Sequence, residues 1–363
     1  MMENSFKING APIGSKNPCY MIAEMSANHG GTIDEARKMI HAAEEMGANA
    51  VKLQTYRADT ITLNCENDDF RLPSANPWET FNTLYALYEK AYTPWEWHEE
   101  LFREAREAGI TIFSSPFDHT SVDLLESLNS PAYKIASPEI TDIPLIKRVA
   151  KTGKPVIIST GLAALEDIEL AVKTLRKHGC HDLAVLRCTT AYPAPPSDSN
   201  LALLPDMAER FNCVVGLSDH TLGQAVPLAS IHYGAKIIEK HFVLNHTDSV
   251  DGFFSLDTKG FQDLITNIRI AEEAIGMVDY TIPESAKANF FARRSLYISA
   301  DVKKGDTITA DNIKSVRPGY GLHPKYYDDI LGKTFVHDAK FGDRLTFASI
   351  DGFDGERDTE GSS

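Results

Sequence analysis

The sequence predicts an α/β protein whose main domain is a closed (β/α)8 barrel, the TIM-barrel fold, followed by a smaller β-rich domain. Eight short β-rich runs alternate with helical patterns over about 250 residues, as expected of such a barrel. Most runs are continuously apolar, which is typical of parallel strands buried on both faces. No glycine-rich dinucleotide fingerprint follows them, so a closed barrel is favoured over a doubly wound open sheet, the competing architecture.

The elements of the barrel follow in order along the chain. A capping box of Thr32 and Glu35 opens one helix, and residues 165–177 and 261–275 show the apolar spacing of two more. The gap between residues 57 and 92 is too long for a simple connection, so we expect an inserted loop over the barrel mouth. The predicted strands are residues 20–25, 50–56, 111–117, 132–137, 155–160, 183–189, 214–220 and 236–242.

The pattern changes after residue 277. A weak repeat, D-x-K-x-G-D-x-[IL]-T, occurs at residues 301–309 and 338–346 and indicates two similar β-turn-β pieces. About 60 residues make a marginal core, so we expect this second domain to dock on another surface. The predicted divisions are a barrel domain over 1–279, a linker over 280–292, a second domain over 293–350 and a disordered acidic tail over 351–363.

Composition narrows the class of protein. Hydrophobic residues make up 43% and charged residues 24% of 363 residues, the ordinary range of a globular enzyme. The net charge of −15 argues against a nucleic-acid partner but allows a small anion held by local lysines. No apolar run is long enough for a membrane span, and the first residues lack the features of a secretory signal. Five cysteines without metal-type spacing indicate reduced thiols, so we expect a cytoplasmic protein.

Two predicted strands end on histidine. His220 and His241 lie 21 residues apart, about one strand–helix unit. If the two strands are parallel neighbours, both imidazoles point into one pocket, and neutral imidazoles beside carboxylates suit a divalent metal such as manganese or zinc. The alternative is two core histidines that are satisfied by neighbouring groups.

Polar side chains end every predicted strand, at the edge where a barrel of this type carries its functional site. Side chains alternate along a strand, so Glu239 and His241 share a face while Lys240 points toward the helices. The polar residues at strand ends are Glu24, Ser26, Asn28, His29, Lys52, Gln54, Tyr56, Ser114, Ser115, Asp118, Lys134, Ser137, Glu139, Ser159, Thr160, Arg187, Thr189, Thr190, Tyr192, Ser218, Asp219, His220, Glu239, Lys240 and His241.

Lys52 and Lys134 lie inside apolar strands, where an unpaired ammonium costs several kcal/mol. Each lysine therefore needs a carboxylate or a bound anion. One alternative is a purely structural pair with Glu24 or Glu139. The other is a site for a phosphate and a carboxylate, formed by the two lysines together with Ser115, Ser137, Ser159 and Ser218.

In combination, these segments resemble the sialic acid synthase family. The resemblance runs from about residue 6 to residue 350, and residues 317–321 (RPGYG) resemble the family's antifreeze-like domain, a β-clip fold also called SAF. Within the family, residues 87–98, 114–118, 250–256 and 317–327 are most similar to the pseudaminic acid branch. The matching motifs are IAE at 22–24, NH at 28–29, KLQ at 52–54, SSPF at 114–117, YKIAS at 133–137, STG at 159–161, CT at 188–189, GLSDHT at 216–221 and EKHF at 239–242.

The resemblance implies an enzyme that condenses phosphoenolpyruvate with an amino-sugar aldose and water, with cleavage of the C–O bond and release of phosphate. For the pseudaminic acid branch the sugar is 2,4-diacetamido-2,4,6-trideoxy-L-altrose, and the neuraminate and legionaminate branches are the alternatives. The resemblance also implies a divalent metal on His220 and His241, with manganese expected first and magnesium or cobalt as alternatives. Glu24 is the candidate to orient water or to exchange a proton.

The resemblance further assigns the substrate contacts. Arg317 is expected to reach the site of a partner subunit, which implies a domain-swapped homodimer. The expected phosphoenolpyruvate contacts are Lys52, Ser115, Lys134, Ser137, Ser159, Thr190 and Ser218. The expected sugar contacts are Gln54, Tyr192 and Asp251.

Two other classes of function remain open at this point. A barrel aldolase could use Lys134 as a Schiff base, since a lysine on a barrel strand is compatible with that chemistry. A binding module for ice or glycans could be led by residues 293–350, but that function does not explain the polar strand ends of the barrel.

Overall fold

The computed structural model describes residues 4–74 and 76–353. The chain divides into two compact units, Met1–Gly276 and Met277–Ser363. Most of the predicted acidic tail, residues 354–363, lies outside the described residues. In the part of the chain that is described, no helix has the length and apolar character needed to cross a bilayer.

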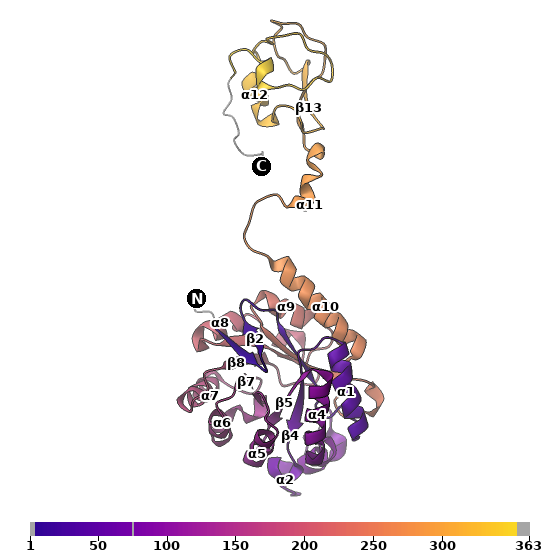
Figure 1. Ribbon diagram of the computed structural model, residues 1–363, viewed down its shortest axis with the longest axis vertical. Helices are drawn as coiled ribbons and strands as arrows, with labels where there is room; N and C mark the ends of the chain where they lie inside the picture. Colours follow the sequence, from indigo (N-terminus) through magenta and orange to yellow (C-terminus); the bar gives the residue numbers. More distant parts are fainter. Residues whose placement is uncertain (1–3, 75, 354–363) are drawn as a thin grey trace. The chain divides into compact units, whose positions relative to one another are not determined.

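The first unit is a closed barrel of eight parallel strands (Figure 1). Closure is shown by the last strand, β10, which pairs with both β9 and β3, so that Lys240 lies opposite Asp219 and His241 opposite Glu24. All eight predicted strands are confirmed, and the open-sheet alternative is wrong. They are β3 (Tyr20–Glu24), β4 (Ala50–Thr55), β5 (Thr111–Pro116), β6 (Tyr133–Ile135), β7 (Val156–Ser159), β8 (Leu183–Cys188), β9 (Val214–Asp219) and β10 (Ile237–Val243).

Helices surround the strands and bury their apolar faces against them. The predicted cap of the first helix is confirmed, because the Thr32 side chain accepts a hydrogen bond from the Glu35 backbone N–H at 3.3 Å. The outer helices are α1 (Ile33–Glu45), α4 (His98–Ala108), α5 (His119–Ser127), α6 (Ile143–Ala150), α7 (Leu165–Lys177), α8 (Leu203–Phe211), α9 (Ala225–His232) and α10 (Thr258–Ile275). Short connecting elements are η3 (Trp95–Trp97), η4 (Ser137–Thr141), η5 (Pro196–Asp198), η6 (His246–Asp248) and β11 (Leu256–Asp257).

A hairpin closes the amino end of the barrel. Strands β1 (Ser5–Ile8) and β2 (Ala11–Gly14) pair antiparallel around Asn9 and Gly10, which both have positive φ. Positive φ at both central positions is what the tight hairpin turn requires. The hairpin packs Ile8 and Ile13 against the apolar residues at the strand starts. A functional site is therefore confined to the opposite, carboxyl end.

The predicted insertion between residues 57 and 92 is confirmed. It contains α2 (Ala58–Ile61), η1 (Asp68–Phe70), η2 (Glu79–Phe81) and α3 (Leu84–Ala91). Its apolar side chains form a small cluster with Ala27 and Val250, two residues of the loops at the carboxyl ends of the strands. The insertion thus covers the end of the barrel that the hairpin leaves open.

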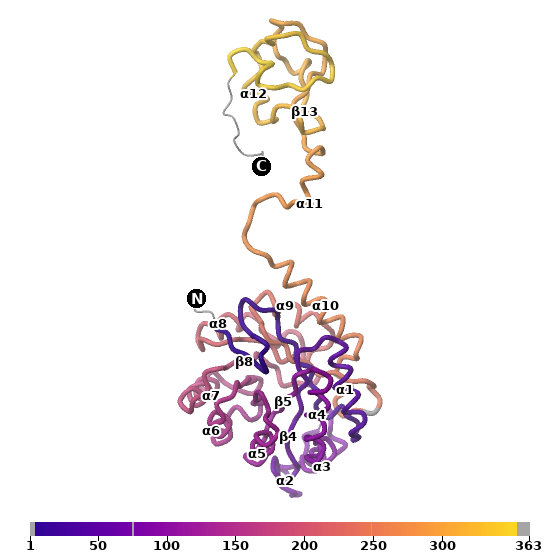
Figure 2. The backbone as a smooth tube through the Cα atoms, in the orientation of Figure 1, coloured from indigo at the N-terminus to yellow at the C-terminus, as the bar shows by residue number. Residues whose placement is uncertain are grey.

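The second unit is built mostly of loops around β12 (Ser295–Ile298) and β13 (Ile313–Val316) (Figure 2). The two copies of its predicted internal repeat are hydrogen-bonded to each other in a reciprocal way. The Asp301 side chain accepts from the Phe341 backbone N–H at 2.8 Å, and Asp338 accepts from Lys304 N–H at 2.9 Å. The unit also contains α11 (Glu284–Lys287), η7 (Phe290–Ala292), η8 (Pro324–Tyr326), α12 (Tyr327–Ile330) and η9 (Phe347–Ser349).

Candidate active site

The inward-facing positions of the strands change from apolar to polar halfway along the barrel. On β10, Ile237 packs with the hairpin, while Glu239 and His241 on the same face line a cavity. The inward-facing side chains of one strand thus form a packed apolar core near its start and line a polar pocket near its end.

The cavity has a volume of about 460 Å³ and lies at the carboxyl ends of the strands. It brings together all but two of the predicted site residues. Those that line it are Glu24, Lys52, Gln54, Lys134, Ser137, Ser159, Thr190, Tyr192, Ser218, His220, His241 and Asp251.

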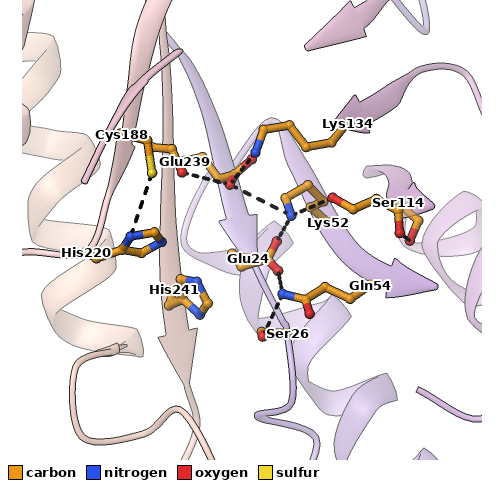
Figure 3. A network of polar contacts seen from close by, with 12 residues as sticks. Glu24, Ser26, Lys52, Gln54, Ser114, Lys134, Cys188, His220, Glu239 and His241 are labelled. Atoms are coloured by element: carbon orange, nitrogen blue, oxygen red, sulfur yellow. Dashed lines mark hydrogen bonds and ion pairs between the residues drawn. The ribbon is translucent and has the colours of Figure 1, made fainter. Parts of the chain in front are cut away.

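Two lysines and two glutamates form a buried charge network at the base of the cavity (Figure 3). Lys52 Nζ lies 2.7 Å from Glu24 Oε2 and 3.8 Å from Glu239 Oε1. Lys134 Nζ lies 3.1 Å from the same Glu239 oxygen. The considered lysine–glutamate pairing is therefore present for Glu24, but the partner of Lys134 is Glu239 rather than Glu139.

The four groups of this network have shifted pKa values because they are buried beside one another. Burial lowers the pKa of Lys134, and the attraction of Glu239 only partly offsets it. For Lys52 the carboxylates outweigh burial and raise its pKa. Burial raises the pKa of Glu24, whereas the two lysines outweigh burial at Glu239 and lower its pKa. A bound anion beside Lys134 would favour its charged form, as Glu239 does.

Hydroxyl groups surround the lysines. Ser218 Oγ donates to Glu239 Oε1 at 3.1 Å, and Ser137 Oγ accepts from the Gly161 N–H at 2.8 Å. Glycine is needed there, since a Cβ at Gly161 would lie 2.1 Å from Thr190 Oγ1. Ser159 Oγ is buried without a hydrogen-bond partner among the described residues, as expected of a group that awaits a ligand.

Ser115 is the predicted barrel residue that does not line the cavity. It is fully buried, and its Oγ accepts from Lys52 Nζ at 3.2 Å. Its effect on a bound anion therefore runs through the lysine. Arg317 belongs to the second unit, where it follows β13 and is exposed, and its role in a partner's site stays a prediction.

The two histidines meet as predicted, with ring centroids 5.3 Å apart. His220 Nδ1 lies 2.9 Å from the Thr189 carbonyl oxygen, so this nitrogen carries the proton and Nε2 is left for a ligand. His241 Nδ1 is buried, has no hydrogen-bond partner within residues 4–74 and 76–353, and lies 3.8 Å from Asp251 Oδ2. Burial lowers the pKa of His241 well below its usual value, which keeps the ring neutral as a metal ligand must be.

The donor set fits an open metal site rather than a closed one. In residues 4–74 and 76–353, no group of three or more His, Cys, Asp or Glu side chains could hold a metal ion. A metal on His220 and His241 would complete its coordination with water and substrate, as catalytic sites do.

Aromatic side chains form a further part of the cavity lining, here called the aromatic wall. The insertion contributes Trp78 and Tyr88, whose rings lie 5.2 Å from Tyr192 and 5.6 Å from Tyr56. Phe254 continues the wall, 5.0 Å from Tyr192. The sequence predicted the insertion but not these contacts, because the insertion has no periodic pattern that indicates which side chains face inward.

Glu139 also lines the cavity, and burial raises its pKa to about 7. A carboxyl group with a raised pKa destabilises the folded state as pH rises from its unfolded value to its folded value. We expect the free energy of unfolding of Glu139→Gln to gain up to about 3 kcal/mol relative to wild type between pH 4.5 and 7. Urea unfolding at several pH values across this range measures this free-energy difference, with the exposed Glu166→Gln as control. If the free energy of unfolding changes with pH in the same way for wild type and Glu139→Gln, the expectation is contradicted.

Comparison with known proteins gives a consistent result. A NeuB family model matches residues 39–280 and a SAF domain model matches residues 293–350. A pseudaminic acid synthase of Campylobacter jejuni subsp. jejuni serotype O:23/36 (strain 81-176) is 43% identical over 90% of this chain and 95% of its own. An N,N′-diacetyllegionaminic acid synthase of Legionella pneumophila is 34% identical over 96% of this chain and 100% of its own.

The solved structures agree. That of N-acetylneuraminic acid synthetase from Leptospira borgpetersenii, in complex with citrate, has a TM-score of 0.69 and 28% identity, and covers 79% of this chain and 95% of its own. The family model spans more than half of the chain, which confirms the resemblance to the sialic acid synthases. The chain therefore belongs to the NeuB family and is an enzyme of that family, with a SAF domain at residues 293–350.

Proposed function

We propose that this protein is a pseudaminic acid synthase. It condenses phosphoenolpyruvate with 2,4-diacetamido-2,4,6-trideoxy-L-altrose and water, and it releases pseudaminic acid and phosphate. One observation carries the proposal: two buried lysines and two histidines share one cavity with a group of aromatic side chains. The 43% identity to a pseudaminic acid synthase, against 34% to a legionaminic acid synthase, supports the choice of sugar.

The base of the cavity binds phosphoenolpyruvate. Lys52 and Lys134 pair with its phosphate and carboxylate, and the serine and threonine hydroxyls complete the contacts. Glu239 attracts both ammonium groups, since its Oε1 lies 3.8 Å from Lys52 Nζ and 3.1 Å from Lys134 Nζ. The remaining contacts come from Ser137, Ser159, Thr190 and Ser218, with Ser115 acting through Lys52.

The bound arrangement allows carbon–carbon bond formation. The methylene carbon of phosphoenolpyruvate attacks the aldehyde carbon of the open-chain sugar, and an oxocarbenium develops at the neighbouring carbon. Water adds there, and phosphate leaves with cleavage of the C–O bond. The water loses both protons as its oxygen becomes the new carbonyl oxygen: one is gained by the new alkoxide and the other leaves with the phosphate. Glu24 is suited to exchange these protons, because burial raises its pKa and its Oε2 lies only 2.7 Å from Lys52.

His220 and His241 would hold a divalent metal, with manganese as the first choice and magnesium or cobalt as alternatives. When bound, such a metal polarises a carbonyl oxygen and makes its carbon electrophilic. The two histidines are suited to hold such a metal, because both rings are buried and line the same cavity as the lysine–glutamate network.

The aromatic wall supports a sugar with apolar groups. Gln54, Tyr192 and Asp251 are placed to contact polar groups of the sugar from the cavity lining. Trp78 and Tyr88 provide apolar surface for the C6 methyl and the acetamido methyls, which the altrose derivative carries together. N-acetylmannosamine has one acetamido group and a hydroxyl at C6, so it matches this wall less well.

The sugar is tested by phosphate release from phosphoenolpyruvate with each candidate in turn. We expect release with manganese and the altrose derivative, with at least about tenfold lower kcat/KM for N-acetylmannosamine, the effect of one or two lost apolar contacts. We also expect a lower kcat/KM for the legionaminate precursor, because it carries the same substituents in a different configuration and cannot place all of them on the same side chains. Assays without sugar and without metal are the controls. A higher kcat/KM for either of the other sugars would reject this substrate and leave the family assignment intact.

A Schiff-base aldolase is the second candidate, and one observation favours it. Burial lowers the pKa of Lys134, which is the change that a Schiff-base lysine needs. Treatment with pyruvate and borohydride separates the two functions. A covalent adduct on Lys134 favours the aldolase, whereas an unmodified protein that releases phosphate from phosphoenolpyruvate favours the synthase.

We also propose a cytoplasmic homodimer in which Arg317 of one subunit serves the site of the other. The exposed position of Arg317 on a separate compact unit is compatible with this role. Mixing an Arg317→Ala protein with a barrel-site variant tests it, because only mixed dimers can combine one intact site from two inactive chains.

A further inference from the structure

Ser26 holds an unfavourable backbone conformation at the edge of the cavity. It lies two residues after the end of β3, is buried, and has a φ of 47°. Every other described non-glycine residue with positive φ is an asparagine, a residue that tolerates this conformation. Serine pays a steric penalty there that glycine would not. Such strain persists only where surrounding structure imposes it, and it clusters at functional sites.

The conformation directs the hydroxyl of Ser26 between two separate parts of the site. Its Oγ accepts from Gln54 Nε2 at 2.9 Å and donates to Asp251 Oδ2 at 2.6 Å. Gln54 is on β4, and Asp251 is in the loop after β10, so the hydroxyl is the side-chain link between them. Figure 3 shows that Gln54 reaches Glu24 and Ser26 from the same amide nitrogen.

The bonds constrain both partners. The Gln54 amide nitrogen donates to Glu24 at 2.9 Å as well as to Ser26, which sets the orientation of its plane and directs its oxygen elsewhere. Asp251 takes the Ser26 hydroxyl on one oxygen and is further held by the Ala27 backbone. Both side chains line the cavity.

We propose that Ser26 is a positioning residue for the sugar substrate: its hydroxyl fixes Gln54 and Asp251 in the orientation that binds the sugar. The inference rests on the proposed function, because it takes Gln54 and Asp251 as sugar contacts. It explains why a strained serine stands where glycine would relax the backbone. Ser26 bonds directly to the two expected sugar contacts, whereas Lys52 and Lys134 pair with Glu24 and Glu239.

Ser26→Gly gives the decisive variant, because it removes the hydroxyl and the strain together. We expect KM for the sugar to rise about tenfold, the effect of losing one or two buried hydrogen bonds. KM for phosphoenolpyruvate is expected to stay within about twofold, within ordinary kinetic scatter, and the melting temperature to stay equal or to rise. A purely structural role predicts the opposite pattern, with both KM values unchanged.

Two further variants serve as controls for Ser26→Gly. Ser26→Ala keeps the strained backbone but lacks the hydroxyl, so it should show the same rise in the KM for the sugar with a lower melting temperature. Asn129→Gly relaxes another positive φ at an exposed position after α5 and should leave both KM values unchanged. If Ser26→Gly and Ser26→Ala both keep the wild-type KM for the sugar, the proposal is overturned.

The outcome is separable from that of the proposed function. The wild-type rate with each candidate sugar tests the reaction and its substrate. The ratio of variant to wild-type KM, measured with whichever sugar the wild type accepts, tests Ser26. An equal rise in both KM values would also reject the proposal, since it would indicate general damage to the cavity.

Discussion

His241→Gln is expected to lower turnover by about 10³-fold while the protein stays folded. The substitution removes one of two imidazoles that face each other at 5.3 Å and leaves the charge network of the lysines intact. Polarisation of a carbonyl by a metal contributes several kcal/mol to the transition state, and each 1.36 kcal/mol is a factor of ten in rate. Losing about 4 kcal/mol of this transition-state stabilisation corresponds to the expected loss of about 10³-fold in turnover.

Direct metal binding provides a second readout that does not depend on activity. Titration of chelator-treated protein with manganese, followed by electron paramagnetic resonance, should show one tight site in wild type and none in His241→Gln. The exposed His232→Gln on α9 is the control for a lost imidazole elsewhere. Full turnover of the wild type after exhaustive chelation, or tight manganese binding by His241→Gln, would contradict the role of this pair.

Lys134→Met is expected to lose both stability and activity, and the two losses can be separated. Glu239 then keeps a buried carboxylate with only a distant lysine at 3.8 Å, which costs about 3–5 kcal/mol when a buried pair is broken. The kcat/KM for phosphoenolpyruvate should fall by about 10²–10³-fold, the effect of losing a charged contact of about 3–4 kcal/mol.

Lys134→Met/Glu239→Gln separates these effects. It leaves neither charge unpaired, so most of the stability should return while activity stays low. Lys240→Met is the matched control, because Lys240 is buried on β10 but pairs with Asp219 at 2.5 Å, away from the cavity lining. It should lose stability without a change in the KM for phosphoenolpyruvate. Chemical denaturation and steady-state kinetics on the same samples measure the two effects. A double variant with wild-type activity would contradict the role of Lys134 in binding the anion.

Elements with strong local patterns were predictable from sequence. Each barrel strand is a short apolar run, and the polar residues at its end mark the carboxyl edge, so the fold and most of the cavity lining follow from alternation alone. The hairpin of residues 5–14 was missed, although Asn9 and Gly10 carry the signal of a tight turn.

Contacts across the barrel interior were not predictable in the same way. The pairing of Lys52 with Glu24 joins neighbouring strands, and register links them directly. Lys134 on β6 and Glu239 on β10 are separated by three strands in the sheet order, so only the closed barrel brings them together. The positive φ of Ser26 has no local sequence signal either, because tertiary contacts impose it.

The most direct test of the account follows the bridging oxygen of phosphoenolpyruvate. The substrate is labelled with ¹⁸O between C2 and phosphorus and is turned over with the altrose derivative and manganese, and the phosphate is read by ³¹P NMR. The account predicts labelled phosphate, formed only when the sugar is present and in equal amount to the nonulosonic acid. Unlabelled phosphate, or phosphate released at the same rate without sugar, would contradict it.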